Sequence, residues 1–374
     1  MIDTIKLLIP IYDPTTLSRG AFRPMSIEQI INSRGVAMTY LNPSKIYAKQ
    51  GKYMPRMTLH RRPRASGIVW QLAVEFSAPK MLFGNNFDEL VEEDLDKLLD
   101  SLQSKLLEML GHRFFKHQLA SAEIGSWHPS KNIVFLDYTS TQTILNTIGK
   151  LDISKVYDFQ STNFRDGHVV HIHTNSLDIA FYDKMADLRK TKISDKRTIM
   201  KENLVQLSLL DKLEETRPLE IFRYEARFVG RRSIKQAYPD LRKWTLEEMF
   251  KKDLCQNILI KHWQRITKSV DLLALDVEKP FELLQNYIEE NNEKPQATLA
   301  AIGAMTIISQ VGALQLRNAI ETHFGKQAWH RLKPLLKSPK KYRYTAFQRI
   351  DEVLSDFSPT KMTKYLEDIE NNSK

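Results

Sequence analysis

One segment constrains the fold of this chain more than any other: residues 219–232, with the sequence LEIFRYEARFVGRR. Successive side chains of a β-strand point to opposite faces of a sheet. The aromatic and apolar residues of this segment therefore share one face, and Arg223, Glu225 and Arg227 share the other. A glutamate between two arginines could serve as a metal ligand, with the arginines on either side binding a phosphate. The alternative is a solvent-exposed face of ion pairs.

A second strand is indicated by residues 177–188, LDIAFYDKMADL. In the same alternation, Asp178 and Tyr182 share a polar face, and Lys184 and Asp187 follow directly after the strand. A tyrosine can attack a phosphodiester and keep the bond energy as a phosphotyrosine. Its pKa is near 10, so it needs a metal ion or a nearby lysine to react. The alternative is an ordinary tyrosine at an interface.

Two further features are typical of metal ligands. Asp137 lies in the otherwise apolar strand predicted for IVFLDY, and buried acids are uncommon unless they are paired or bind a metal. The alternative is an aspartate that caps a turn. His171 and His173 lie two residues apart in HVVHIH and so face the same way on a strand. The alternative is a half-exposed polar face.

The rest of the pattern predicts an α+β protein. Strands are expected over residues 5–11, 67–76 and 133–138, a hairpin over 167–180 that turns at 174–176, and a strand over 218–229. Residues 60–64 are expected to form a basic loop, and 77–86 another loop. Helices are expected over 88–119, 141–151 and 185–213, and from 246 onward. We therefore expect an α+β domain over residues 1–245 and a helical region over 246–374, with a polar linker at 289–295.

Composition narrows the class of partner. The chain has 374 residues, a net charge of +10 and a single cysteine, Cys255, so it has neither an intramolecular disulfide nor a multi-cysteine zinc site. Its N-terminus lacks the features of a signal peptide, and the apolar stretch over 298–316 contains too many polar residues for a membrane span. Nucleic acid in the cytoplasm is therefore the expected partner, with no membrane. Walker, GxGxxG, HExxH and GxSxG motifs are absent from the sequence.

Taken in order, these segments resemble the filamentous-phage gene II/X family of rolling-circle replication initiators. MIDTIKLLIP is similar to that family's start, and VEFSAPKMLFGNN (74–86) to its S-x-x-K-x-L-x-G-x-N signature, which includes Lys80. FLDY, FYDKMAD and FRYEAR resemble the family's acidic, tyrosine and R-F-E-A-R motifs. The sequence departs from the pattern at Phe135, where the family has arginine, and at Asp187, where it has glutamate. The histidine pair has no counterpart in the gene II pattern.

The resemblance implies an antiparallel-sheet nickase domain of the HUH/Rep type, followed by a mostly helical domain. Tyr182, assisted by Lys184, would cleave one strand at the origin, leave a 5′-phosphotyrosine and a free 3′-OH, and later rejoin the strand. The metal would be Mg²⁺ or Mn²⁺, held by Asp137 and Glu225, with His171, His173 and Asp187 as further candidates. Expected partners are double- and single-stranded origin DNA and a host helicase and polymerase. The residues expected to contact DNA are Lys80, Arg189, Lys190, Arg223, Arg227 and Arg331.

The C-terminal region carries its own prediction. Residues 313–337 are expected to form a helix-turn-helix with its turn at Gly325 and with Arg331 on the second helix, and this element would recognise the origin. The alternative is a plain packing helix. Two alternatives to the whole interpretation stay open: a plasmid or conjugative relaxase with the same chemistry, and a non-enzymatic basic DNA-binding regulator.

Overall fold

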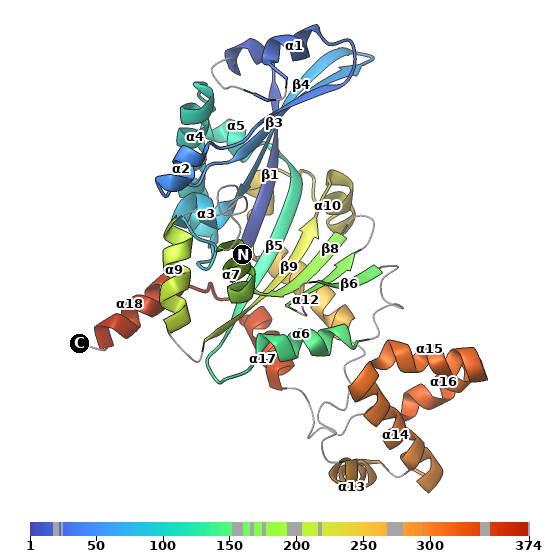
Figure 1. Cartoon of the computed structure of the whole chain (residues 1–374). Helices are drawn as coiled ribbons and strands as arrows, with labels where there is room; N and C mark the ends of the chain where they lie inside the picture. The colour runs from blue at the N-terminus through green and yellow to red at the C-terminus, as the bar shows by residue number, and fades with distance from the viewer. Residues whose placement is uncertain are drawn as a thin grey trace. The chain divides into compact units, whose positions relative to one another are not determined.

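The computed structural model describes residues 1–17, 22–23, 25–151, 160–164, 168–173, 177–192, 204–215, 219–267, 280–291, 293–336 and 345–372. The fold is α+β, built on a nine-stranded sheet in the order β2-β3-β4-β1-β5-β9-β8-β7-β6 (Figure 1). The strands are β1 (Ile2–Ile11), β2 (Ala37–Leu41), β3 (Arg56–Arg64), β4 (Gly67–Ser77), β5 (Glu123–Phe135), β6 (Gln160–Phe164), β7 (Val169–His173), β8 (Leu177–Asp183) and β9 (Glu220–Phe228). The pairings from β2 through β4, β1, β5 and β9 to β8, and that of β6 with β7, are antiparallel.

The two faces of the sheet differ because the strands alternate. On β1, Ile5 and Leu7 are fully buried, whereas the Lys6 side chain between them is 35% exposed and pairs with Glu75. On β9, both faces are buried: Tyr224 donates to the carbonyl of Leu259 on one side, and Arg223 and Glu225 lie on the other. The predicted alternation is confirmed, but a solvent-exposed ion-pair face is wrong for β9.

The helices connect and cover the strands. Short 3₁₀ turns occur at η1 (Pro14–Leu17), η2 (Glu92–Asp94) and η4 (Lys333–Leu335). The α-helices are α1 (Ile27–Asn32), α2 (Lys45–Lys49), α3 (Ala78–Phe83), α4 (Leu95–Leu110), α5 (Lys116–Ala120), α6 (Thr141–Gly149), α7 (Lys184–Lys192), α9 (Leu204–Glu215), α10 (Arg231–Ala237), α11 (Leu246–Met249), α12 (Lys252–Thr267), α13 (Pro280–Glu290), α14 (Pro295–Val311), α15 (Ala313–Phe324), α16 (Lys326–Leu332), α17 (Thr345–Asp356) and α18 (Met362–Asn372).

The chain divides into two compact units that are not the two contiguous segments predicted from the sequence. The first unit contains Met1–Tyr138, Ser176–Leu259 and Phe357–Lys374, and the second contains Thr139–Asn175 and Ile260–Asp356. The first unit extends past the predicted boundary at 245/246 to Leu259, within α12, and it also contains the last residues of the chain. Sequence reasoning missed this return because the residues that hold it are more than 220 positions away along the chain.

Several predicted elements differ from the observed ones. Residues 60–64 belong to β3 and not to a loop, because they form a hairpin with β4 in which Arg61 faces Trp70. The loop predicted at 77–86 contains α3, which ends at Gly84 in the left-handed conformation (φ 75°). The helix predicted over 88–119 is divided into α4 and α5, because Gly111 (φ 64°) caps α4. The predicted turn at 174–176 lies outside the described residues, as does the middle of the helix predicted over 185–213.

The second unit is largely helical. The apolar stretch at 298–316 is interrupted by Gly312 (φ 94°), which separates α14 from α15, and the amide of Ala313 donates to the carbonyl of Lys150. In the part of the chain that the structure describes, no helix has the length and apolar character needed to cross a membrane. Helices α15 and α16 lie side by side and turn at Gly325 (Figure 1), as predicted. The buried Trp329 anchors α16, and Arg331 is exposed on it.

Candidate active site

Neighbouring strands bring the predicted tyrosine and glutamate motifs together. In the antiparallel pairing of β8 with β9, Tyr182 lies opposite Arg223, and Ala180 lies opposite Glu225. The apolar faces of the same strands stack behind them, where Phe181 contacts the rings of Phe222 and Tyr224. This packing fixes the polar side chains of both strands on one face of the sheet.

Glu225 is at the centre of this group. Its Oε1 accepts hydrogen bonds from the Tyr182 hydroxyl at 2.6 Å and from the Arg223 Nε at 3.0 Å. Its Oε2 accepts from the Arg227 Nε at 2.7 Å, and Arg227 also pairs with Asp178 at 3.3 Å. Glu225 is 2% exposed and Tyr182 is 8% exposed. The carboxylate therefore holds the tyrosine hydroxyl and two guanidinium groups in one buried cluster.

The electrostatics of the cluster follow from this arrangement. Burial by itself raises the pKa of Glu225, but Arg227 and Arg223 outweigh burial and hold that pKa well below its ordinary value. Burial and the adjacent Glu225 charge raise the pKa of Tyr182 well above its ordinary value. At neutral pH the resting site therefore holds an ionised glutamate that accepts a hydrogen bond from a protonated tyrosine.

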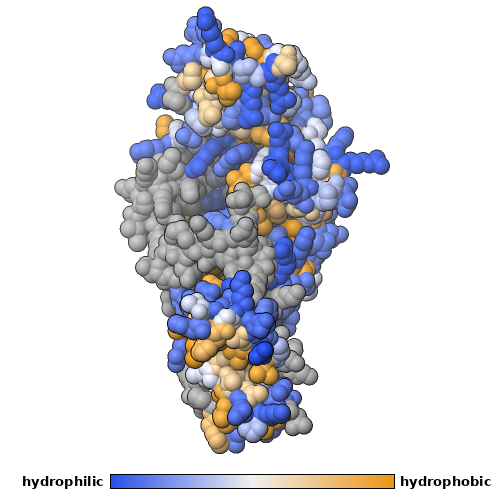
Figure 2. Space-filling view, turned by 90° about the vertical axis from the view of Figure 1, so that its right-hand side faces the viewer, coloured by the Kyte–Doolittle hydropathy of each residue, from blue (hydrophilic) through white to orange (hydrophobic). Residues whose placement is uncertain are grey.

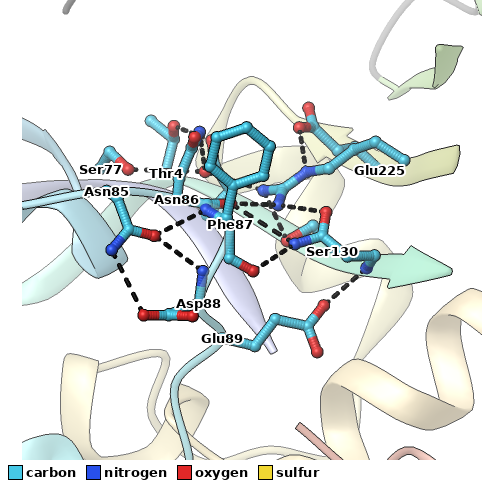
Figure 3. A network of polar contacts seen from close by, with 12 residues as sticks. Thr4, Ser77, Asn85, Asn86, Phe87, Asp88, Glu89, Ser130 and Glu225 are labelled. Carbon is cyan, nitrogen blue, oxygen red and sulfur yellow. Dashed lines mark hydrogen bonds and ion pairs between the residues drawn. The ribbon is translucent and has the colours of Figure 1, made fainter. Parts of the chain in front are cut away.

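Arg223 is held on its other side by three segments that are far apart in the sequence (Figure 3). Its guanidinium donates to Asp3 at 2.8 Å, to the Asn86 carbonyl at 3.1 Å, to Asn132 Oδ1 at 2.9 Å and to Ser130 Oγ at 3.1 Å. Burial lowers the pKa of Arg223, but Asp3 and Glu225 outweigh burial and raise it. The arginine is thus a fixed positive charge beside Tyr182.

The signature segment of residues 74–86 borders the same site. The Ser77 hydroxyl and the Asn86 amide lie 3.5 and 3.2 Å from Asp3 Oδ1 (Figure 3). Lys80 is buried, and its charge is among those that lower the pKa of Asp3, after burial, which raises it, and Arg223, which lowers it. The expected contact of Lys80 with DNA stays a prediction; in the structure this lysine is buried and its charge acts on Asp3.

The other predicted site residues lie on two helices, α7 and α16. Lys184 is buried, and its Nζ lies 5.9 Å from the centroid of the Tyr182 ring. Asp187 is half-buried one turn further along α7. Arg189 is half-exposed and pairs with Glu214 at 2.5 Å, and the Lys190 side chain lies outside the described residues. Arg331 belongs to the second unit.

Asp137 is not part of the cluster. β5 ends at Phe135, and Asp137 is exposed just beyond it. Ser130 is the residue of β5 that pairs with Glu225, and the strand end at Phe135, which precedes Asp137, lies five residues further along, or about 17 Å at ~3.3 Å per residue. A shared metal site for Asp137 and Glu225 is therefore wrong. The acid lies beyond the strand, where the chain turns at Tyr138 (φ 63°).

One group of three side chains among the described residues could hold a metal ion. His171, His173 and Asp178 offer ligand atoms that all lie within 4.8 Å of one another. They lie on β7 and β8, which are neighbours in the sheet, and the two imidazole rings stack at 5.2 Å. The prediction that these histidines face the same way is confirmed, and Asp178 is a ligand candidate that sequence reasoning did not select.

Sequence reasoning also missed Asp3, His128 and Asn132. Asp3 lies on β1 beside Thr4, before the apolar run that the sequence indicates from Ile5, so no apolar pattern marks it. His128 lies within 3.0 Å of the Ser126 hydroxyl, and burial lowers its pKa while Glu225 raises it. Nothing in the local sequence marks Asn132, whose role depends on long-range contact with Arg223.

Comparison with known protein families, with curated proteins and with solved structures gives no match for this chain. The geometry of the site is therefore the basis for assigning a function.

Proposed function

We propose that this protein is a metal-dependent DNA nickase of the rolling-circle type, in which Tyr182 is the nucleophile. The observation that carries the proposal is the buried hydrogen bond of 2.6 Å between Tyr182 and Glu225, flanked by Arg223 and Arg227. A tyrosine hydroxyl beside a carboxylate and two guanidinium groups has what strand cleavage needs: a nucleophile, a proton acceptor and charges that suit a phosphate.

In this proposal the Tyr182 oxygen attacks the scissile phosphorus, an O–P bond to the tyrosine forms, and the P–O3′ bond breaks. Glu225 accepts the tyrosine proton, and the departing 3′ oxygen takes up a proton to become the 3′-OH. Arg223 and Arg227 stabilise the charge that develops on the phosphate oxygens. Because Tyr182 is a poor acid in its resting environment, a bound phosphate must rearrange the arginine contacts before the tyrosine can react. Rejoining is the reverse of the same transfer.

The proposed metal is Mg²⁺ or Mn²⁺, held by His171, His173 and Asp178. Its donor set of two imidazoles and a carboxylate fits a divalent cation. When bound, such an ion polarises a phosphate oxygen. Helices α15 and α16 would recognise the origin, with the exposed Arg331 on α16 as a contact. The partners would be origin DNA and a host helicase and polymerase, in the cytoplasm of the host.

A nicking assay tests this function. A supercoiled plasmid that carries the DNA flanking the protein's own gene is incubated with the protein and Mn²⁺, and a denaturing gel reports cleavage. Wild type is expected to nick, and Tyr182→Phe is expected to lose at least a thousandfold in rate. Glu225→Gln should lose most activity, whereas Asp137→Asn should nick like wild type because Asp137 is exposed and outside the site. Full activity of Tyr182→Phe would refute the proposal, and DNA binding without nicking by wild type would favour a regulator.

A further inference from the structure

Toward β2, the sheet carries partly exposed polar side chains around Lys6, which is 35% exposed. A cavity of about 390 Å³ lies over β1, β2, β3 and β4 and beside α10, and the polar side chains that line it include Lys6, Tyr40, His60, Arg62 and Arg231. We call these five residues the sheet tract. Figure 2 shows that hydrophilic residues cover much of the described surface in that view.

Strand register links the sheet tract to the active site within the first unit. Lys6 pairs with Ser126 on β5, and the Ser126 hydroxyl lies 3.0 Å from His128 Nε2. Burial lowers the pKa of His128, and the neighbouring charges of Glu225 and Arg227 raise and lower it, respectively. From β8, which carries Tyr182, to β3, which carries Arg62, there are five steps between strands. At ~4.8 Å each, these five steps span about 24 Å across the sheet.

The tract has a positive excess. Lys6, Arg62 and Arg231 carry three positive charges, and the carboxylates that pair with them are Glu75, at 2.8 Å from Lys6, and Glu123, at 2.8 Å from Arg231. Burial lowers the pKa of His60, and the charges of Arg62 and Lys6 lower it further, so this histidine adds no charge at neutral pH. Tyr40 is 40% exposed and offers an aromatic face among these cations.

We propose that the sheet tract binds the backbone of a single DNA strand that continues from the phosphate held at Tyr182. The inference rests on the proposed function and extends it to the substrate. A groove of cations with an exposed aromatic ring is the surface that single strands bind, through phosphate neutralisation and base stacking. Half-buried cations on a sheet face are accessible to a single strand, whose bases can turn toward Tyr40.

Binding of a labelled single-stranded oligonucleotide, measured against salt concentration, tests the tract without requiring cleavage. Each phosphate contact contributes ~0.7 to the slope of log K against log[salt] for single strands. The double variant Lys6→Gln/Arg62→Gln is expected to reduce that slope by about 1.4. Glu75→Gln should bind more tightly than wild type, because it frees Lys6 from its ion pair. Lys97→Gln, which removes an exposed charge from α4, is the matched control and should not change the slope.

The sheet tract and the nickase function can be refuted independently of each other. An unchanged slope in the double variant, with the fold intact by circular dichroism, would overturn the sheet tract even if Tyr182 nicks DNA. If the double variant reduced the slope equally for a duplex of the same length, the preference for a single strand would be overturned. A reduced slope in a protein that never nicks would support the tract and refute the nickase.

Discussion

Replacement of Arg223 by methionine is expected to lower the free energy of unfolding by about 3–5 kcal/mol and to abolish nicking. Arg223 is 1% exposed and joins Asp3 to Glu225. Its removal leaves two buried carboxylates without this shared partner, and unpaired buried charges are strongly destabilising. Denaturant unfolding followed by circular dichroism measures the loss. Methionine retains much of the side-chain volume, so the effect reports charge more than a cavity.

A second substitution separates this electrostatic role from simple packing. Asp3→Asn removes one of the two negative charges, so the double variant Arg223→Met/Asp3→Asn should recover part of the lost stability. Arg223→Lys, which keeps the charge but loses the branched geometry, should be less destabilised than Arg223→Met. A change of less than 1 kcal/mol in Arg223→Met, or no recovery in the double variant, would contradict the assignment of Arg223 as the central fixed charge.

Deletion of residues 357–374 is expected to abolish nicking and to destabilise the first unit by about 5 kcal/mol, because Phe357, Met362 and Leu366 lose their burial. This segment binds the loop 85–89, whose Asn86 carbonyl holds Arg223 (Figure 3). The amide of Thr360 donates to Glu89 Oε2 at 3.0 Å. Met362 and Leu366 also pack in the core that includes Met185 and Leu188 of α7, the helix that follows Tyr182.

Addition of a synthetic peptide of residues 357–374 is the control for this deletion. The peptide should restore nicking if the segment acts by binding to the first unit. Thr363→Val, which removes a hydroxyl that donates to Asp88, should weaken that rescue. Wild-type activity of the deletion variant would contradict the account.

Through Glu89, the stability of the fold depends on pH. Burial alone raises the pKa of Glu89, but Lys131, at 2.5 Å, outweighs it and lowers the pKa from 4.5 to about 2. A folded-state pKa below the unfolded one stabilises the fold above pH 4.5, and that stabilisation is lost as the pH falls toward 2. Glu89→Gln should therefore lose most stability relative to wild type near neutral pH and less at pH 3. An equal loss at both would contradict the ion pair.

The sequence predicts what is local and misses what is long-range. The alternation on β8 and β9 determines the face of Tyr182, Glu225 and the two arginines, so that part of the site follows from neighbouring residues alone. Asp137 shows the limit of the method: an acid after an apolar run has the same pattern whether the strand continues or ends before it. Asn132 and Thr360 contribute through contacts with residues tens to hundreds of positions away, which no local pattern records. The discontinuous first unit escaped prediction for the same reason.

The most direct test of the central claim is identification of the residue that becomes attached to DNA. The protein is incubated with Mn²⁺ and a single-stranded oligonucleotide that contains the cleavage site mapped in the plasmid assay, then digested with protease and nuclease, and the modified peptide is sequenced by mass spectrometry. We predict a nucleotide 5′-phosphate on Tyr182, in the peptide that joins β8 to α7, and none in the Tyr182→Phe variant. A phosphotyrosine at any other position, or cleavage with no covalent product, would contradict the assignment of Tyr182 as the nucleophile.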